Sequence, residues 1–316
     1  MTIKESYELF LQNGSTYWVE STKVYYEKNC GYFFQYLEKC HPEFENIDIA
    51  ELPRDILKDY IIWLRNKDRF SGHPLRNDMR VTGKVKANTV KTYMRAVKAY
   101  FNFLYDQGYL KYRYTYKLTL PRSDDDQIVP LLASEVAAID NCFDRSVPND
   151  LRNLCIFHLM LDAGLRSCEV CNLTPSDIIF HSRSIVVNQG KGNKSRIVIM
   201  GQVLCDLLTD YFDMFSPSGY LFYKSNSREP INYSVMKSLF QRIVRNTDIC
   251  RVHPHLLRHT FATSFLMGGG NLESLRILMG HVDYSVTRRY LHLATQNQII
   301  KSDIYKLDPA FFNNGY

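Results

Sequence analysis

The sequence predicts a mainly α-helical protein of two domains, the second of which also contains a small antiparallel sheet. A length of 316 residues suits two domains, and a hydrophobic content of 45% is sufficient for two cores. Long segments in both halves place apolar residues three or four positions apart, as amphipathic helices do. Two β-rich runs, residues 184–189 and 195–200, flank the Gly-containing string GKGNK and predict a hairpin.

The first domain is expected to span residues 1–116 and to be helical. Ser15 or Thr16 could cap a helix that runs through residues 16–39, where aromatic and apolar residues recur at helical spacing. Pro53 precedes a second helix, and Asn88 or Thr89 caps a third helix that ends at a glycine. The second and third helices are predicted over residues 54–67 and 88–108, and the polar segment 71–86 between them reads as a loop.

An interdomain linker is expected at residues 117–129. This stretch has little periodicity and contains a proline and three consecutive aspartates, Asp124–Asp126. The second domain then covers residues 130–316. It begins with helices over residues 133–143 and 149–164, continues with the hairpin, and is helical again from about residue 203.

Composition excludes several classes of protein. The chain has no run of about 18 apolar residues that could cross a membrane, and residues 1–10 lack the features of a signal peptide. Eight cysteines are too few for a disulfide scaffold in a chain of this length, so we expect a cytoplasmic protein with reduced thiols. Cys168 and Cys171 form a C-x-x-C pair with no second pair of ligands, which favours helix packing over a metal site.

Positive charge is concentrated in one part of the first domain. Residues 65–98 contain ten basic and two acidic residues, a net charge of +8, whereas the whole chain carries +6. Lys91, Arg95 and Lys98 lie opposite the apolar stripe of the third predicted helix. Such a cluster suits a polyanion such as DNA, although a solvated helix face would look the same.

Six residues in the second domain have side chains suited to phosphoryl transfer on a phosphodiester. Two arginines can hold the non-bridging phosphate oxygens, a tyrosine can attack phosphorus, and a lysine can protonate the leaving alkoxide. Histidines can accept the phenol proton or donate to the phosphoryl group, and no metal or other cofactor is required. The residues follow the order Arg166, Lys191, His255, Arg258, His281 and Tyr290, the last on a predicted helix with Arg288 and Arg289.

The same region resembles the tyrosine recombinase, or phage integrase, family. The matching strings are AGLRSCEV, GKGNKSR, HPHLLRHTFAT and LMGHVDYSVTRRYLHL, in the order that the family shows. By position, the resemblance implies catalytic roles for the six residues above and a supporting role for Glu169 beside the first arginine. Lys194 is an alternative to Lys191, whereas His253 and His259 are offset from the family pattern.

The resemblance also implies an architecture and a set of partners. It implies a helical, SAM-like core-binding domain and an α+β catalytic domain of the DNA breaking-rejoining type, which together clamp duplex DNA at inverted-repeat core sites. Four protomers would act through a Holliday junction, with the tail after Tyr290 docked on a neighbouring protomer or on its own domain, and an accessory DNA-bending protein could assist. The expected phosphate contacts are Arg80, Lys84, Lys86, Lys91, Arg95 and Lys98.

The biological role is left open at this level. We favour a site-specific recombinase of a mobile genetic element, and an Xer-type enzyme that resolves chromosome or plasmid dimers is the first alternative. A type IB topoisomerase-like enzyme would use the same residue types but relax supercoils without defined sites. A DNA-binding protein that has lost catalysis is the remaining alternative, and the complete set of six residues argues against it.

Overall fold

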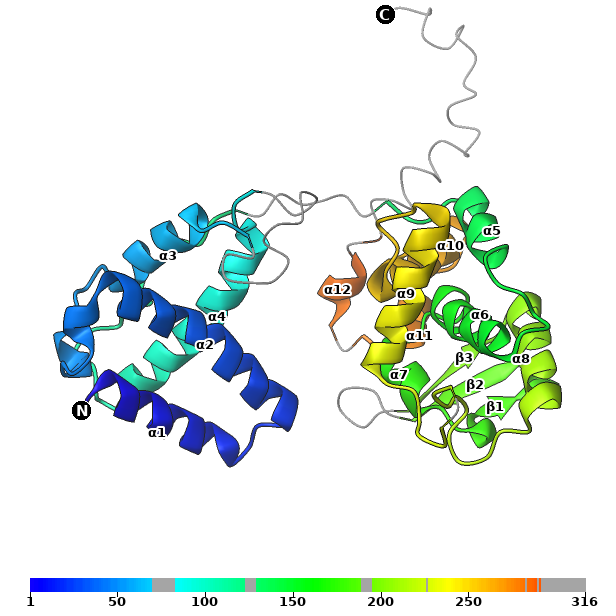
Figure 1. Cartoon of the computed structure of the whole chain (residues 1–316), viewed down its shortest axis with the longest axis horizontal. Helices are drawn as coiled ribbons and strands as arrows, with labels where there is room; N and C mark the ends of the chain where they lie inside the picture. The colour runs from blue at the N-terminus through cyan, green and yellow to red at the C-terminus, as the bar shows by residue number, and fades with distance from the viewer. Residues whose placement is uncertain are drawn as a thin grey trace, which may run out of the picture. The chain divides into compact units, whose positions relative to one another are not determined.

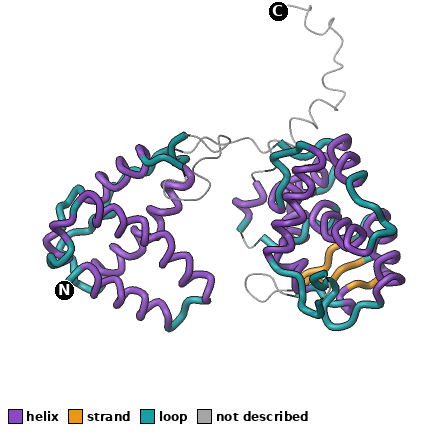
Figure 2. The backbone as a smooth tube through the Cα atoms, viewed as in Figure 1, coloured by secondary structure: helices purple, strands orange, loops and turns teal. Residues whose placement is uncertain are grey.

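The computed structural model describes residues 1–69, 83–122, 129–188, 195–225, 227–281, 283–288 and 290. The chain forms two compact units, Met1–Asp126 and Gln127–Tyr316 (Figure 1). The strands lie in the second unit only, within the described residues (Figure 2). A mainly helical fold with one small antiparallel sheet was predicted, and this is confirmed.

Among its described residues, the N-terminal unit contains four helices and two short 3₁₀ turns. They are α1 (Ile3–Ser15), α2 (Glu20–Cys40), η1 (Pro42–Phe44), η2 (Ile49–Glu51), α3 (Ile56–Asn66) and α4 (Ala87–Asp106). Their apolar faces meet in a core rich in aromatic rings, where Phe33 packs edge-to-face on both Tyr60 and Phe101. The buried face of α4 is the apolar stripe that the sequence indicates, so Lys91, Arg95 and Lys98 lie away from the core.

The start of this unit differs from the prediction. Helix α1 was not predicted, and α2 begins at Glu20 rather than next to Ser15 or Thr16. Thr2 and Glu5 form a capping box that starts α1, a T-x-x-E signal that lies at the very beginning of the chain. Between the helices the Trp18 ring packs against Gly14, where a Cβ atom would lie 2.2 Å from the ring and would block this turn.

The C-terminal unit wraps helices around one central helix and a three-stranded sheet. Helix α6 (Pro148–Leu161) is buried along nearly its whole length and packs against α8 and α10. The other elements are α5 (Ala133–Asp140), α7 (Ser167–Asn172), η5 (Pro175–Asp177), β1 (Ile178–Ile179), η6 (Phe180–Ser182), β2 (Ser184–Val187), β3 (Arg196–Ile199), α8 (Gln202–Phe215), α9 (Tyr233–Thr247), α10 (Pro254–Met267), α11 (Leu272–Met279) and α12 (Tyr284–Arg288).

The predicted hairpin is present as the antiparallel pair β2–β3. Ile185 pairs with Val198 and Val187 with Arg196, while the unpredicted strand β1 adds to the other side of β2. Strand β3 alternates buried and exposed side chains, so Arg196 and Val198 face the interior. This alternation carries a charged side chain, Arg196, into the unit, where it needs a buried partner.

A buried histidine ties α5 to the end of α6. His158 Nε2 lies 2.9 Å from an oxygen of Asp140, and its Nδ1 lies 2.7 Å from an oxygen of Asp162. Burial lowers the pKa of His158, but hydrogen bonds to Asp140 and Asp162 outweigh it and raise the pKa to about 9. The folded protein therefore holds this proton over a pH range in which the unfolded chain has lost it.

We expect the free energy of unfolding to fall as the pH rises from 6.5 to about 9. Below pH 6.5 both states bind the proton, so the ion pairs contribute fully; above it only the folded state does, and the contribution declines by an amount of the order of 2 kcal/mol. Urea unfolding at pH 6, 7.5 and 9 measures this change. His158→Gln should remove the dependence, and an unchanged dependence in that variant would contradict the assignment.

Three further observations concern the cysteines, metal binding and the membrane. All eight cysteines are free thiols, and Cys168 and Cys171 lie on α7. Within the described ranges, no group of three or more His, Cys, Asp or Glu side chains is arranged to hold a metal ion. No helix among the described residues combines the length and the apolarity that a bilayer span requires.

Candidate active site

Three of the predicted catalytic residues, Arg166, Arg258 and His281, lie around the carboxyl end of α11. Arg166 precedes α7, Arg258 lies on α10, and His281 follows the left-handed Gly280 that ends α11. Four successive carbonyl oxygens at this end each accept a hydrogen bond from a different arginine: Leu278 from Arg196 at 2.7 Å, Met279 from Arg258, Gly280 from Arg166 at 3.3 Å, and His281 from Arg276 at 3.1 Å.

This arrangement follows from the physics of a helix terminus. The last carbonyls of an α-helix lack partners within the helix and carry partial negative charge, which favours cations. Gly280 adopts φ +59° and allows the chain to turn so that the carbonyls fan out. A Cβ atom at Gly280 would lie 3.2 Å from the Arg196 side chain, so the arginines pack closely against this turn.

Glu169 forms ion pairs with two of these arginines, Arg166 and Arg196. Its side chain is only 1% exposed, and both of its oxygens pair with the Arg196 guanidinium at 2.7 and 2.8 Å. It also accepts from Arg166 Nη1 at 2.8 Å and from the Arg166 backbone N–H at 2.7 Å. Burial raises the pKa of Glu169, but the hydrogen bonds from Arg196 and from the Arg166 backbone outweigh it, so the pKa is lowered and the group stays a carboxylate.

Arg258 is the most deeply placed cation of the site. Its residue is 5% exposed, and its guanidinium donates to the carbonyl oxygens of Gly164 and Met279. Burial lowers the pKa of Arg258 to about 9, with Arg166 acting in the same direction. The side chain therefore remains charged at neutral pH although it lies close to a second cation. A bound anion such as phosphate would offset the repulsion between the two cations.

His281 is held as a neutral imidazole. Burial lowers its pKa to about 4, and Arg258 and Arg166 contribute in the same direction. Arg258 Nη2 lies 3.3 Å from His281 Nε2, and because a guanidinium only donates, Nε2 is the acceptor. The proton is therefore on Nδ1, which donates to Thr287 Oγ1 at 2.9 Å.

His255 is exposed and lies on α10, about one helical turn before His259. Partial burial lowers its pKa, and His253, Arg258 and Arg166 lower it further. Because His255 lies three residues before Arg258 on α10, the two side chains share one side of this helix. It is therefore suited to contact a bound anion from the open side of α10.

Tyr290 does not lie on a helix, contrary to the prediction. Helix α12 ends at Arg288, and Tyr290 sits in the following turn, where its N–H donates to the Thr287 carbonyl at 3.1 Å. Its ring is buried against apolar side chains of α10 and α11, and its hydroxyl is hydrogen bonded to His259 Nδ1. Tyr290 also raises the pKa of Arg258, so the phenol lies within electrostatic reach of this arginine.

Two residues of this cluster were not predicted from the sequence. Arg196 was visible only as the last letter of the GKGNKSR string, and nothing in the sequence indicated that strand alternation turns it towards Glu169. His259 was set aside because it is offset from the family pattern, yet it is the histidine in contact with Tyr290. Lys191 and its alternative Lys194 lie outside the described residues, in the segment that joins β2 to β3.

The expected phosphate contacts lie in the N-terminal unit, except that Arg80 is outside the described residues. Lys84 pairs with Asp68 at 2.7 Å, Lys86 precedes α4, and Lys91, Arg95 and Lys98 lie on α4.

A second basic cluster was not predicted, although the string KYRYTYK at residues 111–117 alternates cations with aromatic rings. It borders a hollow of about 570 Å³ with Arg54 and Lys58, and Arg54 lies 3.6 Å above the Tyr112 ring.

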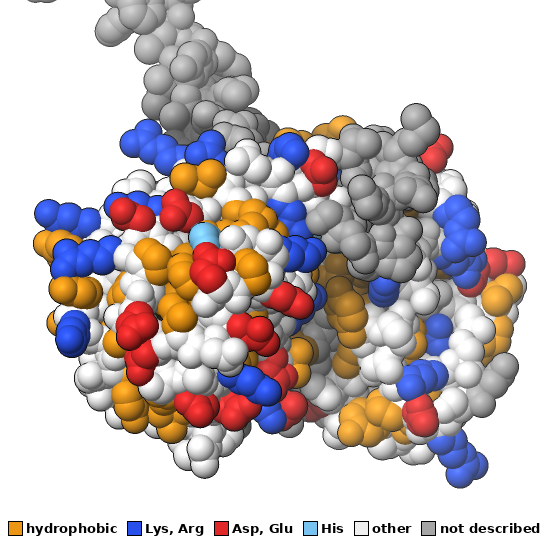
Figure 3. All heavy atoms as spheres, turned by 60° about the vertical axis from the view of Figure 1, so that its left-hand side comes forward, with side chains coloured by type: hydrophobic (Ala, Val, Ile, Leu, Met, Phe, Trp, Pro, Cys, Tyr) orange, Lys and Arg blue, Asp and Glu red, His pale blue; other side chains and the backbone are white. Residues whose placement is uncertain are grey.

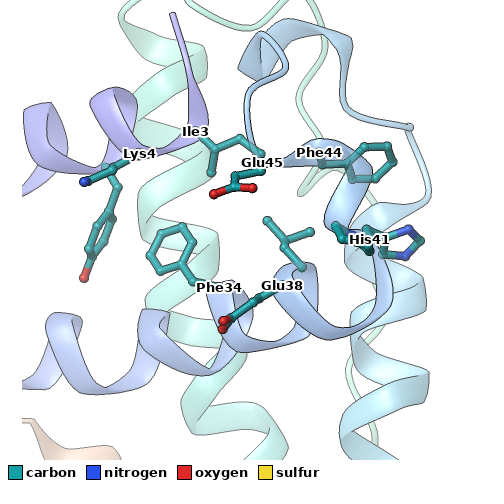
Figure 4. A pocket seen from close by; sticks show the side chains of 10 residues that line it. Ile3, Lys4, Phe34, Glu38, His41, Phe44 and Glu45 are labelled. Carbon is teal, nitrogen blue, oxygen red and sulfur yellow. The ribbon is translucent and has the colours of Figure 1, made fainter.

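Another hollow in this unit has a different character. It measures about 510 Å³ and lies between α1, the end of α2 and η1, where Ile3, Phe34 and Phe44 surround it with Glu38 and Glu45 beside them (Figure 4). Figure 3 likewise shows hydrophobic and acidic side chains intermixed on one face of this unit. Lys4 and His41 also line this hollow, and none of the predicted site residues does.

Comparison with known proteins identifies the class. Residues 130–297 match the sequence model of the phage integrase family. A tyrosine recombinase of Thermosipho africanus is 28% identical over 281 residues, which cover 88% of this chain and 91% of that protein. The tyrosine recombinase XerC of Staphylococcus carnosus is 29% identical over 220 residues, covering 67% of this chain and 73% of XerC.

Solved structures agree at the level of the fold. The integrase of transposon Tn1549, in complex with a circular intermediate DNA, superposes with a TM-score of 0.70 at 18% identity, covering 92% of this chain and 95% of the integrase. The XerH recombinase bound to a palindromic difH substrate gives a TM-score of 0.67 at 18% identity, over 90% and 80% of the two chains. The chain belongs to the phage integrase family, and its enzyme class is tyrosine recombinase.

Proposed function

We propose that the protein cuts and rejoins double-stranded DNA at specific sites through a covalent 3′-phosphotyrosine at Tyr290. The observation that carries the proposal is the convergence of Arg166, Arg258, His281 and Tyr290 at the end of α11, from four separate segments of the chain. Arg166 and Arg258 would hold the non-bridging oxygens of one phosphate, and His255 and His281 would add contacts to it.

The electrostatics of the site support this role. A phosphodiester gains charge on its non-bridging oxygens as the nucleophile attacks, and preorganised cations stabilise that charge best. The hydrogen bonds of Glu169 and of the α11 carbonyls fix the arginines before DNA arrives. The Tyr290 oxygen would attack phosphorus, and Lys191 would protonate the departing 5′ oxygen.

A duplex with a nick close to the cleavage position tests the proposal. The short strand released on cleavage diffuses away, so a covalent protein–DNA adduct accumulates and can be mapped by mass spectrometry to one residue. The wild-type protein should form the adduct on Tyr290, and Tyr290→Phe should form none while still binding the duplex. An adduct on another residue, or the absence of any adduct on its own site, would refute the proposal.

The adduct assay, a plasmid relaxation assay and a DNA-binding assay together distinguish the alternative functions. Relaxation of supercoiled plasmid without a defined site would indicate topoisomerase-like activity, and binding without an adduct would indicate a DNA-binding protein.

We propose four protomers on two inverted-repeat sites, with strand exchange through a Holliday junction and with the tail after residue 290 joining neighbouring protomers. The proposed tail contact lies outside the described residues, and deletion beyond residue 300 tests it by loss of synapsis.

For the biological role we propose integration of a mobile genetic element, with the help of an accessory DNA-bending protein. Resolution of chromosome or plasmid dimers is the second candidate, because XerC and XerD recombinases are among the relatives. Footprinting on the genomic DNA around the gene distinguishes the two. Protected inverted repeats at the ends of an element support integration, and a single chromosomal repeat supports dimer resolution.

The basic residues of the N-terminal unit are proposed to contact DNA phosphates. Replacing Lys91, Arg95 and Lys98 by alanine should weaken DNA binding at every sequence and reduce the slope of log K against log salt by about 2 to 3. Lys91→Arg with Lys98→Arg keeps the charge and should keep the slope. Titrations at several salt concentrations measure it, and an unchanged slope in the alanine variant would contradict these contacts.

The KYRYTYK segment is proposed to add to the same interaction. Lys111, Arg113 and Lys117 are exposed, and Arg113 and Lys117 each lie over a tyrosine ring. Cations backed by aromatic rings can contact phosphates and sugars together. Their replacement by alanine should lower the same salt slope independently of the α4 residues.

A further inference from the structure

We propose that His259 accepts the proton of the Tyr290 hydroxyl when that oxygen attacks the scissile phosphate. The inference rests on the proposed role of Tyr290 as the nucleophile, and it assigns the base to a residue outside the family pattern. Its starting point is the hydrogen bond between His259 Nδ1 and Tyr290 Oη, with the two rings 5.4 Å apart and inclined at 48°.

Both partners are positioned by one face of α10. His259, Ala262 and Leu266 follow each other at helical spacing, and the latter two form one buried cluster with Tyr290 and with Leu275 and Met279 of α11. The apolar residues fix the ring, and His259 contacts its hydroxyl from the same helix. The distance between base and nucleophile is therefore set by a rigid element before DNA binds.

The neighbouring histidine is committed to other contacts. His281 uses Nε2 to accept from Arg258 and Nδ1 to donate to Thr287, so neither ring nitrogen is available to take a proton from a phenol. His259 in its neutral form needs only to carry its own proton on Nε2, which leaves Nδ1 as the acceptor for the Tyr290 hydroxyl. The charge that develops on the phenolic oxygen is then stabilised by Arg258, whose interaction with Tyr290 is favourable.

The step balances within the residues named. The Tyr290 oxygen forms a bond to phosphorus, its proton moves to His259 Nδ1, the bond from phosphorus to the 5′ oxygen breaks, and Lys191 supplies the proton to that oxygen. In rejoining, a 5′ hydroxyl attacks the phosphotyrosine and gives its proton to Lys191. The departing phenolate then recovers its proton from His259.

The experiment compares two nicked substrates, one normal and one with sulfur in place of the 5′ bridging oxygen at the cleavage position. A thiolate leaves without a proton, so the sulfur substrate removes the need for an acid and leaves the need for a base unchanged. His259→Ala and His259→Asn should both form the adduct about 10²- to 10³-fold more slowly on normal DNA. The defect should persist on the sulfur substrate, whereas that of Lys191→Ala should largely disappear.

Two controls make the result specific. His259→Asn can still hydrogen bond to the Tyr290 hydroxyl but cannot bind its proton, so it separates the loss of a base from the loss of a contact. His253→Ala changes a histidine at the start of the same helix, whose Nδ1 is bonded to the Arg251 carbonyl, and should cleave at the wild-type rate. Thermal unfolding of each variant shows whether the fold is kept.

Three outcomes would overturn the proposal. If His259→Ala forms the adduct at the wild-type rate or faster, the hydrogen bond only holds Tyr290 in its resting position. If His259→Asn forms it at the wild-type rate, His259 positions Tyr290 but does not accept its proton. Rescue of the His259 variants by sulfur would place His259 at the leaving group. If the adduct of the wild-type protein forms on a residue other than Tyr290, the proposed nucleophile is wrong. Mapping the wild-type adduct tests this before any His259 variant is measured.

Discussion

Replacing Glu169 by alanine is expected to lower the free energy of unfolding by about 3–5 kcal/mol. The carboxylate is almost fully buried and pairs with the two terminal nitrogens, Nη1 and Nη2, of Arg196, whose own side chain is 6% exposed. Without it, Arg196 would be left as a buried cation with the Leu278 carbonyl as its remaining described acceptor. Removing one partner of a buried pair costs far more than the net value of the pair, because the other charge remains out of water.

A matched control lies in the same unit. Glu273 and Arg276 form a pair with the same i, i+3 spacing as Arg166 and Glu169, but Glu273 is about half exposed. Glu273→Ala should therefore change the free energy of unfolding far less than Glu169→Ala does. Urea unfolding at neutral pH compares the two variants, and equal effects would show that burial does not determine the value of the Glu169 contacts.

The pH dependence of the Glu169 contribution follows from its lowered pKa. Its stabilisation is complete above the ordinary carboxyl pKa of 4.5 and is lost as the pH falls through the lower value of the folded state. The wild-type protein should therefore lose stability on acidification more steeply than Glu169→Ala. Unfolding curves between pH 3 and 6 measure the difference.

Local patterns predicted the elements that local forces create. The apolar stripe of α4 and the Gly-containing turn between β2 and β3 both follow from spacing and composition, and both elements are present. Helix α1 was not predicted, although Thr2 and Glu5 carry its capping signal; Ser15, which was expected to cap the next helix, is instead the last residue of α1. The helix expected at Arg288 is present as α12, but Tyr290 lies in a turn after it, where its ring is buried with apolar side chains of α10 and α11.

The candidate site likewise contains residues that sequence motifs indicate and contacts that only the packing of the fold creates. Arg166, Arg258, His281 and Tyr290 were found because four strings occur in a family order, which is information carried by the sequence. The partnership of Arg196 with Glu169 joins residues 27 positions apart, and that of His259 with Tyr290 joins residues 31 apart. Such contacts depend on how helices and strands pack, and no spacing rule within one element predicts them.

Arg258→Lys is expected to slow formation of the covalent adduct by about 10²- to 10³-fold while leaving affinity for duplex DNA within a few-fold of wild type. The guanidinium of Arg258 reaches the carbonyl of Gly164 before α7, the carbonyl of Met279 in α11, and His281 Nε2. An ammonium group has no planar fork that can span acceptors on separate elements, so one of these buried acceptors would lose its donor. We expect DNA affinity to depend instead on the phosphate contacts proposed for the basic residues of the N-terminal unit.

Single-turnover cleavage of the nicked duplex measures this loss, and the control is Arg245→Lys on the exposed side of α9, which should cleave normally. The comparison isolates geometry, because both substitutions preserve charge and only Arg258 is buried among fixed acceptors. If Arg258→Lys cleaved at the wild-type rate, a point charge at this position would be sufficient for catalysis. The hydrogen bonds that anchor the guanidinium to the end of α11 would then have no part in stabilising the transition state, and the convergence of arginines there would be a structural feature of the fold.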